Sequence, residues 1–477
     1  MVQVRLVLVA CGCALSLALA ACGSRLDPDD VAAVQGNSGT VAQDGSVPGT
    51  TDPGAAAGAD TGGGTAAGTG TGSTGSAGGS AGGESQGTGA NSATGTTKPG
   101  SCDGLKNQTG ITGSTITLAN ISDISGPVPG IFESAQEATR AYAAYFNSSN
   151  DLCGRKLDVV LLDSRADSGA DQQAYTKACE EAFAAVGSMS AFDAGGAATA
   201  EGCGLPDIRS TAVNPERNDC ATCFGAQAID PGRIPSAVHK YFLKTQKAAT
   251  QKAAMLYING GAAPVNAQAF ASAAEKNGWN EVYVEGIDVS EFNYAPYVQE
   301  MKEAGVQLVQ YVGPYQNTVK LQQAMQQQGF EPKVFLQDAT IYDARYVEQS
   351  GEVGDGSYVY MNNQMFERTN IPEMALYQSW LQQVKPGATP TFFGLYAWSA
   401  TRLFVEKAVE LGGKLDRKTL VAAMRKVDKW DGNGLHVPMH VGAKQTAECS
   451  MIIQLNGGKW SQKSPGKNIC GPTTAAD

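Results

Sequence analysis

Hydrophobic and polar positions switch between a strand period and a helix period along residues 115–427, which predicts strands that are each followed by a helix. Thr115 to Ile121 carries β-branched residues at strand spacing, and Ser125-Gly126-Pro127 ends the strand. From Phe132 to Tyr145, apolar residues recur at helical spacing. We therefore expect a first β-α unit whose loop lies at the carboxyl end of its strand, where open α/β folds bind polar small molecules.

The same alternation continues in two series separated by a break at residues 218–228. The first series has strands at 157–163, 183–189 and 207–213 and a helix at 168–182 opened by Ser168. The second series alternates helices at 234–245, 266–277, 294–304 and 317–328 with strands at 253–259, 281–286, 308–313 and 333–337. Two such series predict an α/β protein with two Rossmann-like, doubly wound lobes and a cleft between them.

The last part of the chain adds helices to this scheme. After a strand at 357–361, helical patterns cover 372–384, 391–411 and 417–427. The middle helix has a broad apolar face that includes Trp398, so we expect it in the core. Residues 449–460 predict a β-hairpin with Asn456-Gly457 as its turn.

The N-terminal hundred residues predict export and attachment rather than folding. Met1 to Ala21 has one charged residue, Arg5, and then an apolar run too short to span a bilayer, as in a signal peptide. The following Cys22 completes Leu19-Ala20-Ala21-Cys22, which resembles a bacterial lipobox and implies a lipidated Cys22; the alternative is an ordinary signal peptide. Residues 22–100 are rich in Gly, Ser, Thr and Ala and predict a disordered tether.

Charge and cysteine content narrow the class of protein. The formal net charge of −11 argues against nucleic-acid binding, which requires a concentrated basic face. Eight cysteines follow Cys22, and an even number in an exported domain suggests disulfides. Our hypothesis pairs sequence neighbours: Cys102 with Cys153, Cys179 with Cys203, Cys220 with Cys223, and Cys449 with Cys470. A redox pair or half a zinc site are alternatives for Cys220 and Cys223, but no second CxxC or paired His follows.

Catalytic signatures are few. Of three His residues, His239 lies in a predicted helix, while His436 and His440 flank Pro438, which disfavours the helix that would hold a metal-binding pair. The sequence has no G-x-S-x-G, P-loop or HExxH motif. Asn259-Gly260-Gly261 follows a strand and could cradle an anion, although a plain β-α turn is favoured. We expect no enzyme, no metal site and no cofactor.

Five short segments occur in an order and spacing typical of one family. They are Ile124 to Pro127, Arg155 to Asp163, Val186 to Ser190, Ala212 to Glu216 and Gln310 to Tyr315. From Gly113 to Trp460 the chain thereby resembles the leucine/isoleucine/valine-binding proteins, the type I periplasmic substrate-binding proteins of ABC importers. The resemblance implies two lobes that close on a small ligand, joined by three crossovers near 224–229, 361–364 and 434–441.

The expected domains follow from this resemblance. They are a lipoprotein signal peptide (1–21), a lipidated Cys22 with its tether (22–100), lobe 1 (101–228 plus 364–437) and lobe 2 (229–363 plus 438–477). The implied function is an extracytoplasmic, lipid-anchored substrate-binding protein that captures a small organic solute, amino-acid-like or aromatic. Its expected partners are the ABC permease and ATPase subunits, and we expect a monomer. A ligand-sensing receptor subunit of the same fold is the alternative, and an extracellular hydrolase is a weaker one.

The expected binding residues lie on loops that follow strands. By resemblance, Ser190 and Ala191 supply a hydroxyl and backbone donors, Thr211 stands near the missing hydroxyl of Ala212-Val213, and Tyr315 and Asp338 come from the second lobe. Asp193 and Asp338 offer acceptors, although Asp193 has the alternative role of capping the helix after its loop. Aromatic walls are expected from Phe132, Phe192, Tyr315 and Tyr342, with core packing as the alternative for Phe192 and Tyr342.

Overall fold

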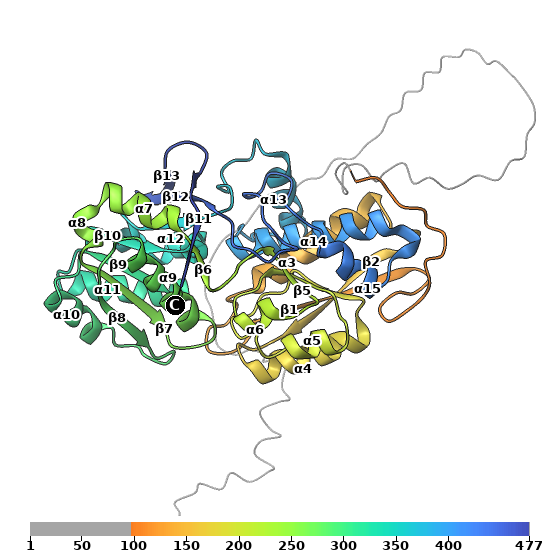
Figure 1. Ribbon diagram of the computed structural model, residues 1–477, viewed down its shortest axis with the longest axis horizontal. Helices are drawn as coiled ribbons and strands as arrows, with labels where there is room; N and C mark the ends of the chain where they lie inside the picture. Colours follow the sequence, from red (N-terminus) through yellow and green to blue (C-terminus); the bar gives the residue numbers. More distant parts are fainter. Residues whose placement is uncertain (1–96, 477) are drawn as a thin grey trace, which may run out of the picture. The chain divides into compact units, whose positions relative to one another are not determined.

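A parallel five-stranded sheet with the strand order β2-β1-β3-β4-β5 forms the first lobe of the computed structural model, which describes residues 97–476 (Figure 1). Its strands are β1 (Thr115–Ser122), β2 (Lys156–Asp163), β3 (Ala184–Val186), β4 (Asp207–Thr211) and β5 (Cys223–Gln227). Its connecting helices are α3 (Glu133–Ser149), α4 (Ser168–Glu181), α5 (Ala197–Gly202) and α6 (Pro215–Asp219). Strands β3 and β4 in the sheet and β5 at its edge are buried along their whole length, because helices cover both faces of the sheet.

The second lobe is built on an eight-stranded sheet. Its main path has the order β13-β12-β11-β10-β9-β7-β8, and β14 pairs with β12. The strands from β7 to β11 are parallel, and β12 joins them antiparallel to β11. The strands are β7 (Ala253–Ile258), β8 (Glu281–Ile287), β9 (Leu308–Val312), β10 (Val334–Gln337), β11 (Tyr358–Met361), β12 (Cys449–Asn456), β13 (Lys459–Gln462) and β14 (Ile469–Cys470). A separate two-stranded ribbon pairs β6 (Arg233–Pro235) with β15 (Thr473–Ala475).

Helices of the second lobe connect these strands, as helices do in other α/β folds with a mostly parallel sheet. They are α7 (Ser236–Thr245), α8 (Lys247–Thr250), α9 (Ala263–Lys276), α10 (Ala295–Glu303), α11 (Tyr315–Gln327) and α12 (Ala344–Ser350). Among the described residues, the 3-10 helices η1 (Ala339–Ile341) and η2 (Gly351–Gly354) also belong to this lobe, and η3 (Gly412–Lys414) lies further along the chain. The hydrophobic residues of α9 and β7 pack together in the core of this lobe.

The chain then returns to the first lobe with α13 (Pro372–Val384), α14 (Phe392–Leu411) and α15 (Arg417–Met424). Helix α14 packs on α3 and on β4, and Figure 1 shows it beside α3. Trp398 of α14 is completely buried, and its indole N–H donates to Glu373 Oε1 at 2.6 Å. Arg402 Nη1 lies 2.7 Å from the other oxygen of Glu373, so the buried carboxylate is paired. The prediction that this helix lies in the core is correct.

The predicted fold class, two doubly wound α/β lobes, is confirmed, and two local predictions are wrong. The predicted break at 218–228 contains β5. This strand is short and has Gly225 in its interior, so its sequence shows no strand pattern, and it forms by pairing with β4. Helix α4 begins at Ser168 as predicted, but its cap is Asp167, whose side chain accepts from the N–H of Ala170. The hairpin loop is Gly457-Gly458, because Asn456 pairs with Lys459 and both loop positions have φ above +50°.

The eight cysteines after Cys22 form four disulfides in the structure. The pairs are Cys102–Cys153, Cys179–Cys203, Cys220–Cys223 and Cys449–Cys470, the same neighbours as in the sequence-based hypothesis. Three of the four lie in the first lobe: Cys102–Cys153 joins two loops, Cys179–Cys203 joins α4 to the end of α5, and Cys220–Cys223 joins the end of α6 to β5.

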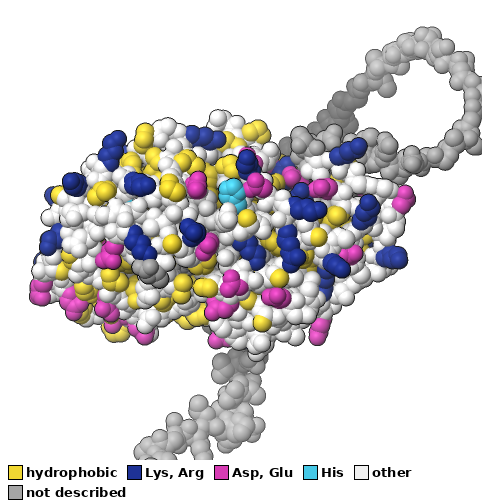
Figure 2. All heavy atoms as spheres, in the orientation of Figure 1, with side chains coloured by type: hydrophobic (Ala, Val, Ile, Leu, Met, Phe, Trp, Pro, Cys, Tyr) yellow, Lys and Arg dark blue, Asp and Glu magenta, His cyan; other side chains and the backbone are white. Residues whose placement is uncertain are grey.

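Other predictions fall on residues the structure does not describe, or concern surfaces. The signal peptide, Cys22 and most of the tether lie outside residues 97–476. Of the helices within that range, none combines the length and hydropathy that a membrane crossing requires. On the face shown in Figure 2, Lys and Arg side chains are spread among Asp and Glu side chains.

Candidate functional site

An apolar cavity of about 230 Å³ lies where the loops at the carboxyl ends of strands from both sheets meet. Loops after β1, β2, β3 and β4 line it from the first lobe, and loops after β7, β8, β9 and β10 line it from the second. The apolar lining includes Val128, Ile131, Phe132, Met189, Phe192, Val213, Ile258, Val289, Val312, Pro314 and Phe393. Its polar lining consists of Asp123, Asn266, Asp338 and Thr340. This position is the one at which open α/β sheets bind small molecules.

A buried hydrogen-bond network holds the loop that follows β3. Asn120 Nδ2 donates to Thr139 Oγ1 at 2.9 Å and to the carbonyl of Val186 at 3.1 Å. Ser122 Oγ donates to Asn120 Oδ1 at 2.7 Å and accepts from the N–H of Met189 at 3.1 Å. The chain therefore leaves β3 in one fixed direction, with Met189 against the cavity.

Gly187 makes this loop possible. Its φ is +70°, and a Cβ at this position would lie 2.1 Å from Thr139 Oγ1. A side chain here would therefore displace the network as well as strain the backbone. The V-G-S-M-S segment has its glycine where β3 ends and the binding loop begins.

Asp123 is a carboxylate at the end of β1 that sequence reasoning missed. It is fully buried and lines the cavity. Oδ1 accepts from Ser164 Oγ at 2.6 Å and from the N–H of Ala166 at 3.0 Å, and Oδ2 accepts from the N–H of Ala191 at 2.8 Å. Desolvation by burial raises the pKa of Asp123, and these hydrogen bonds oppose the rise. Its place directly after a predicted strand was the signal that could have identified it.

Five of the predicted binding residues lie together in the cavity wall: Phe132, Ala191, Phe192, Val213 and Asp338. Asp338 directly follows β10, and its Oδ1 accepts from the N–H of Thr340 at 2.9 Å. Burial raises the pKa of Asp338, and its hydrogen bonds with Thr340 oppose the rise. Two other wall residues, Asn266 and Phe393, lie inside helical patterns that gave no sign of a binding role.

Tyr315 and Tyr342 line a small recess beside the cavity rather than the cavity itself. The ring of Tyr315 lies under the guanidinium of Arg345, 5.2 Å from ring centroid to Cζ. Tyr342 donates its hydroxyl to Glu367 Oε2 at 2.6 Å and stacks on Phe366 with a centroid distance of 4.4 Å. The hydroxyl of Tyr342 is therefore already engaged within the protein.

Four predicted residues are buried and do not belong to the cavity lining: Ser190, Asp193, Thr211 and Ala212. Ser190 Oγ accepts from the N–H of Phe192 at 3.0 Å. Asp193 Oδ1 accepts from Asn214 Nδ2 at 2.7 Å, and Oδ2 accepts from the N–H of Val213 at 3.1 Å. Asp193 thus holds the wall residue Val213 in place through its backbone N–H and is not itself part of the cavity lining. It does not cap α5 either, because the N-cap of that helix is Gly196.

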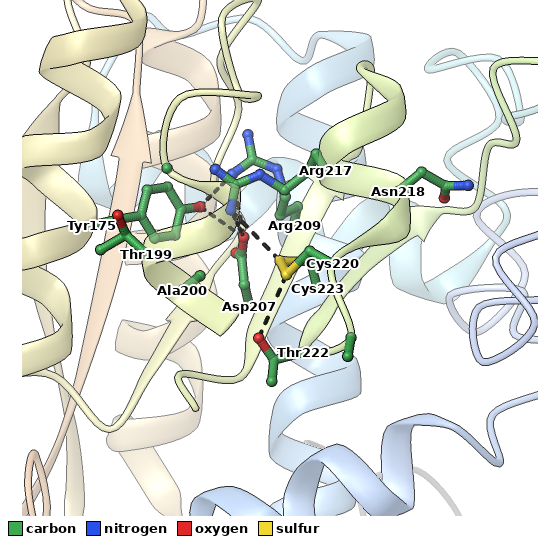
Figure 3. The surroundings of a disulfide bond; sticks show 12 residues. Tyr175, Thr199, Ala200, Asp207, Arg209, Arg217, Asn218, Cys220, Thr222 and Cys223 are labelled. Carbon is green, nitrogen blue, oxygen red and sulfur yellow. Dashed lines mark hydrogen bonds and ion pairs between the residues drawn. A yellow bond between two sulfur atoms is a disulfide. The ribbon is translucent and has the colours of Figure 1, made fainter. Parts of the chain in front are cut away.

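A buried ionic cluster supports Asp193 on the side away from the cavity. Figure 3 shows the guanidinium groups of Arg209 and Arg217 beside Tyr175 and Asp207, next to the Cys220–Cys223 disulfide. Arg217 Nη1 lies 2.9 Å from Asp207 Oδ2, and its Nε donates to the carbonyl of Asp193 at 2.7 Å. Arg209 Nε lies 3.6 Å from Asp193 Oδ2. The cluster therefore ties β4 and the segment after it to the loop after β3, through residues that do not line the cavity.

The two lobes touch at one side of the cavity. The N–H of Ala262 donates to the carbonyl of Ala191 at 2.9 Å, and Asn266 Nδ2 donates to the carbonyl of Val213 at 3.3 Å. Gly261 has a φ of +55°, and a Cβ there would lie 2.7 Å from the oxygen of Ala191. The Asn-Gly-Gly turn therefore allows close approach of the lobes; both Gly260 and Ala262 line the cavity.

Two lobes with a solute-sized cavity at their facing strand ends define a two-lobed solute-binding protein. A scan against protein families matches residues 115–459 to the model described as "Periplasmic binding protein". The chain belongs to the periplasmic binding protein family. Comparison with curated proteins gives no match.

Solved structures share the fold at low sequence identity. The fatty acid ABC transporter substrate-binding protein from Thermomonospora curvata has a TM-score of 0.66 and 17% identity, over 77% of this chain and 96% of that one. The leucine binding protein LivK from Thermotoga maritima has a TM-score of 0.63 and 15% identity, over 75% and 99%. A solute binding protein from R. palustris in complex with 4-hydroxybenzoate has a TM-score of 0.62 and 17% identity, over 76% and 98%. These likenesses support the type I fold predicted from the sequence.

Proposed function

We propose that this protein is the extracytoplasmic substrate-binding lipoprotein of an ABC importer and captures a small, largely apolar solute between its lobes. The observation that carries the proposal is the apolar cavity of about 230 Å³ formed by strand-end loops of both lobes. A cavity of this kind buries a small organic molecule on most sides and needs only a few polar groups for orientation. The similar structures include a fatty acid ABC transporter substrate-binding protein, a leucine binding protein and a solute binding protein in complex with 4-hydroxybenzoate, which supports a solute with an apolar body.

Capture proceeds by hinged closure in this proposal. Lobe 1 comprises 101–228 plus 364–437 and lobe 2 comprises 229–363 plus 438–477, and the three crossovers between them act as the hinge. The contacts from Ala262 to Ala191 and from Asn266 to Val213 belong to the closed form. Cys22 carries the lipid anchor, the tether spaces the lobes from the membrane, and the permease and ATPase subunits receive the solute.

The test is thermal denaturation of the full-length chain against a metabolite library of amino acids, aromatic acids, amines, amides, polyols and nucleosides. A solute at 100 times its dissociation constant should stabilise the protein by about 2.7 kcal/mol. Replacing Tyr315 with Ala removes a ring from the recess beside the cavity and should weaken binding of that solute while the lobe stays folded. An unchanged melting curve across the whole library would contradict solute capture.

A further inference from the structure

Building on the solute-binding function proposed above, we propose that the solute is an apolar amine without a carboxylate, and that Asp338 receives its cationic end. The inference deepens the proposed function by naming the class of solute. It rests on which hydrogen-bonding groups of the cavity are already used and which group is left.

Four backbone donors of the cavity wall that could hold an anion are occupied by the protein's own side chains. The N–H of Ala191 donates to Asp123, and that of Phe192 donates to Ser190. The N–H of Val213 donates to Asp193, and that of Thr340 donates to Asp338. All four residues line the cavity, on loops from both lobes. A carboxylate brought into this wall would therefore have to displace an internal acceptor at each donor.

Charged side chains of the wall also disfavour an anion. The described residues that line the cavity include two carboxylates, Asp123 and Asp338, and no Lys, Arg or His. In the adjoining recess, Arg345 pairs with Asp343, with 2.7 Å between Nη2 and Oδ2. Burying a ligand carboxylate without donors and beside like charges costs several kcal/mol. The cavity therefore excludes fatty acids and aromatic acids more strongly than it excludes neutral or cationic molecules.

Asp338 is the group with acceptor capacity left for a ligand. Among the described residues, donors to its carboxylate come from Thr340 alone. Asp123, in contrast, is fully buried and already accepts three hydrogen bonds from Ser164, Ala166 and Ala191. An ammonium group placed at Asp338 would pair with the wall carboxylate that lines the cavity and is not fully buried.

Aromatic side chains complete the match to a cation. Phe132, Phe192 and Phe393 line the same cavity, and the rings of Phe132 and Phe393 pack edge to face with centroids 4.7 Å apart. Aromatic faces attract ammonium groups and pack equally well against an alkyl or aryl body. The amine thus meets a negative group and apolar walls in a single cavity.

The experiment compares matched amines and carboxylates by isothermal titration on the full-length chain. The pairs are 2-phenylethylamine with phenylacetate and octylamine with octanoate, and phenylalanine carries both charged groups. We expect at least one amine to bind at least 10-fold more tightly than its carboxylate partner and than phenylalanine. A carboxylate that binds as tightly as its amine partner overturns the inference and leaves solute capture standing. Failure of these compounds and of the entire metabolite library overturns both.

A substitution at Asp338 tests the role of its charge. Asp338→Asn keeps an oxygen for the N–H of Thr340 but removes the negative charge, so amine binding should weaken by about 10- to 100-fold. Asp416→Asn is the matched control, because Asp416 caps α15 by accepting from the N–H of Thr419 at an exposed site, and neither it nor its chain neighbours line the cavity. Equal amine affinities of Asp338→Asn and the wild type, at unchanged melting temperature, would refute the placement of the amine.

Discussion

Glu281 provides a test of the second lobe that needs no ligand. It opens β8 at the edge of the sheet, and Gln310 Nε2 of β9 donates to its Oε1 at 2.7 Å. Its other carboxylate oxygen and Gln310 Oε1 are buried without partners among the described residues. Desolvation raises the pKa of Glu281 from 4.5 to about 8; the hydrogen bond from Gln310 opposes the rise, and Glu275 adds to it.

The sign of the pH effect follows from this raised pKa. Below pH 4.5 the carboxyl is protonated in both the folded and the unfolded protein, so it costs the folded state nothing. Between pH 4.5 and about 8 the unfolded chain ionises while the folded side chain stays protonated, and stability falls as pH rises. The full shift corresponds to roughly 5 kcal/mol, but the side chain is partly exposed, so we expect about 1–2 kcal/mol after screening.

Glu281→Gln should remove this cost and place an amide donor near the unpaired Gln310 Oε1. At pH 9 the variant should melt on the order of 2–5 °C above the wild type, and at pH 5 the two should nearly coincide. Thermal unfolding followed by circular dichroism at both pH values measures the difference. Glu285→Gln, an exposed position on the same strand, is the control and should show little change. An equal effect of Glu281→Gln at both pH values would refute the reasoning.

Three further substitutions test other parts of the structure. Gly261→Ala should weaken binding of the solute found by screening by about 10-fold, because the new Cβ would lie 2.7 Å from the oxygen of Ala191 in the other lobe. Gly329→Ala is the control: Gly329 has a similar φ but open space around it, so this variant should keep the wild-type affinity. Replacing Cys102 and Cys153 by Ser opens a 51-residue loop and should cost about 4 kcal/mol in denaturant unfolding, and no loss would contradict it. Arg217→Met removes the buried ion pairs of Arg217 with Asp171 and Asp207 and should cost about 3–5 kcal/mol. An unchanged denaturation midpoint would show that the cluster does not brace the loops.

The sequence by itself determined the fold class, because periodicity and turn residues are local properties. The alternation of strand and helix periods identified both lobes, and the apolar face around Trp398 identified the core helix. Local signals failed where a neighbour decides the outcome: β5 exists because it pairs with β4, and the hairpin loop is Gly457-Gly458 because of the register between β12 and β13.

The tertiary structure decided which side chains meet the cavity. Asp193 and Ser190 stand on the predicted loop, but hydrogen bonds to Val213, Asn214 and Phe192 turn their oxygens into the wall. Asp123 instead reaches the cavity from the end of β1 and occupies the N–H of Ala191. A sequence shows which donors and acceptors a loop carries, but only packing shows which of them are already paired. The class of solute depends on those that remain.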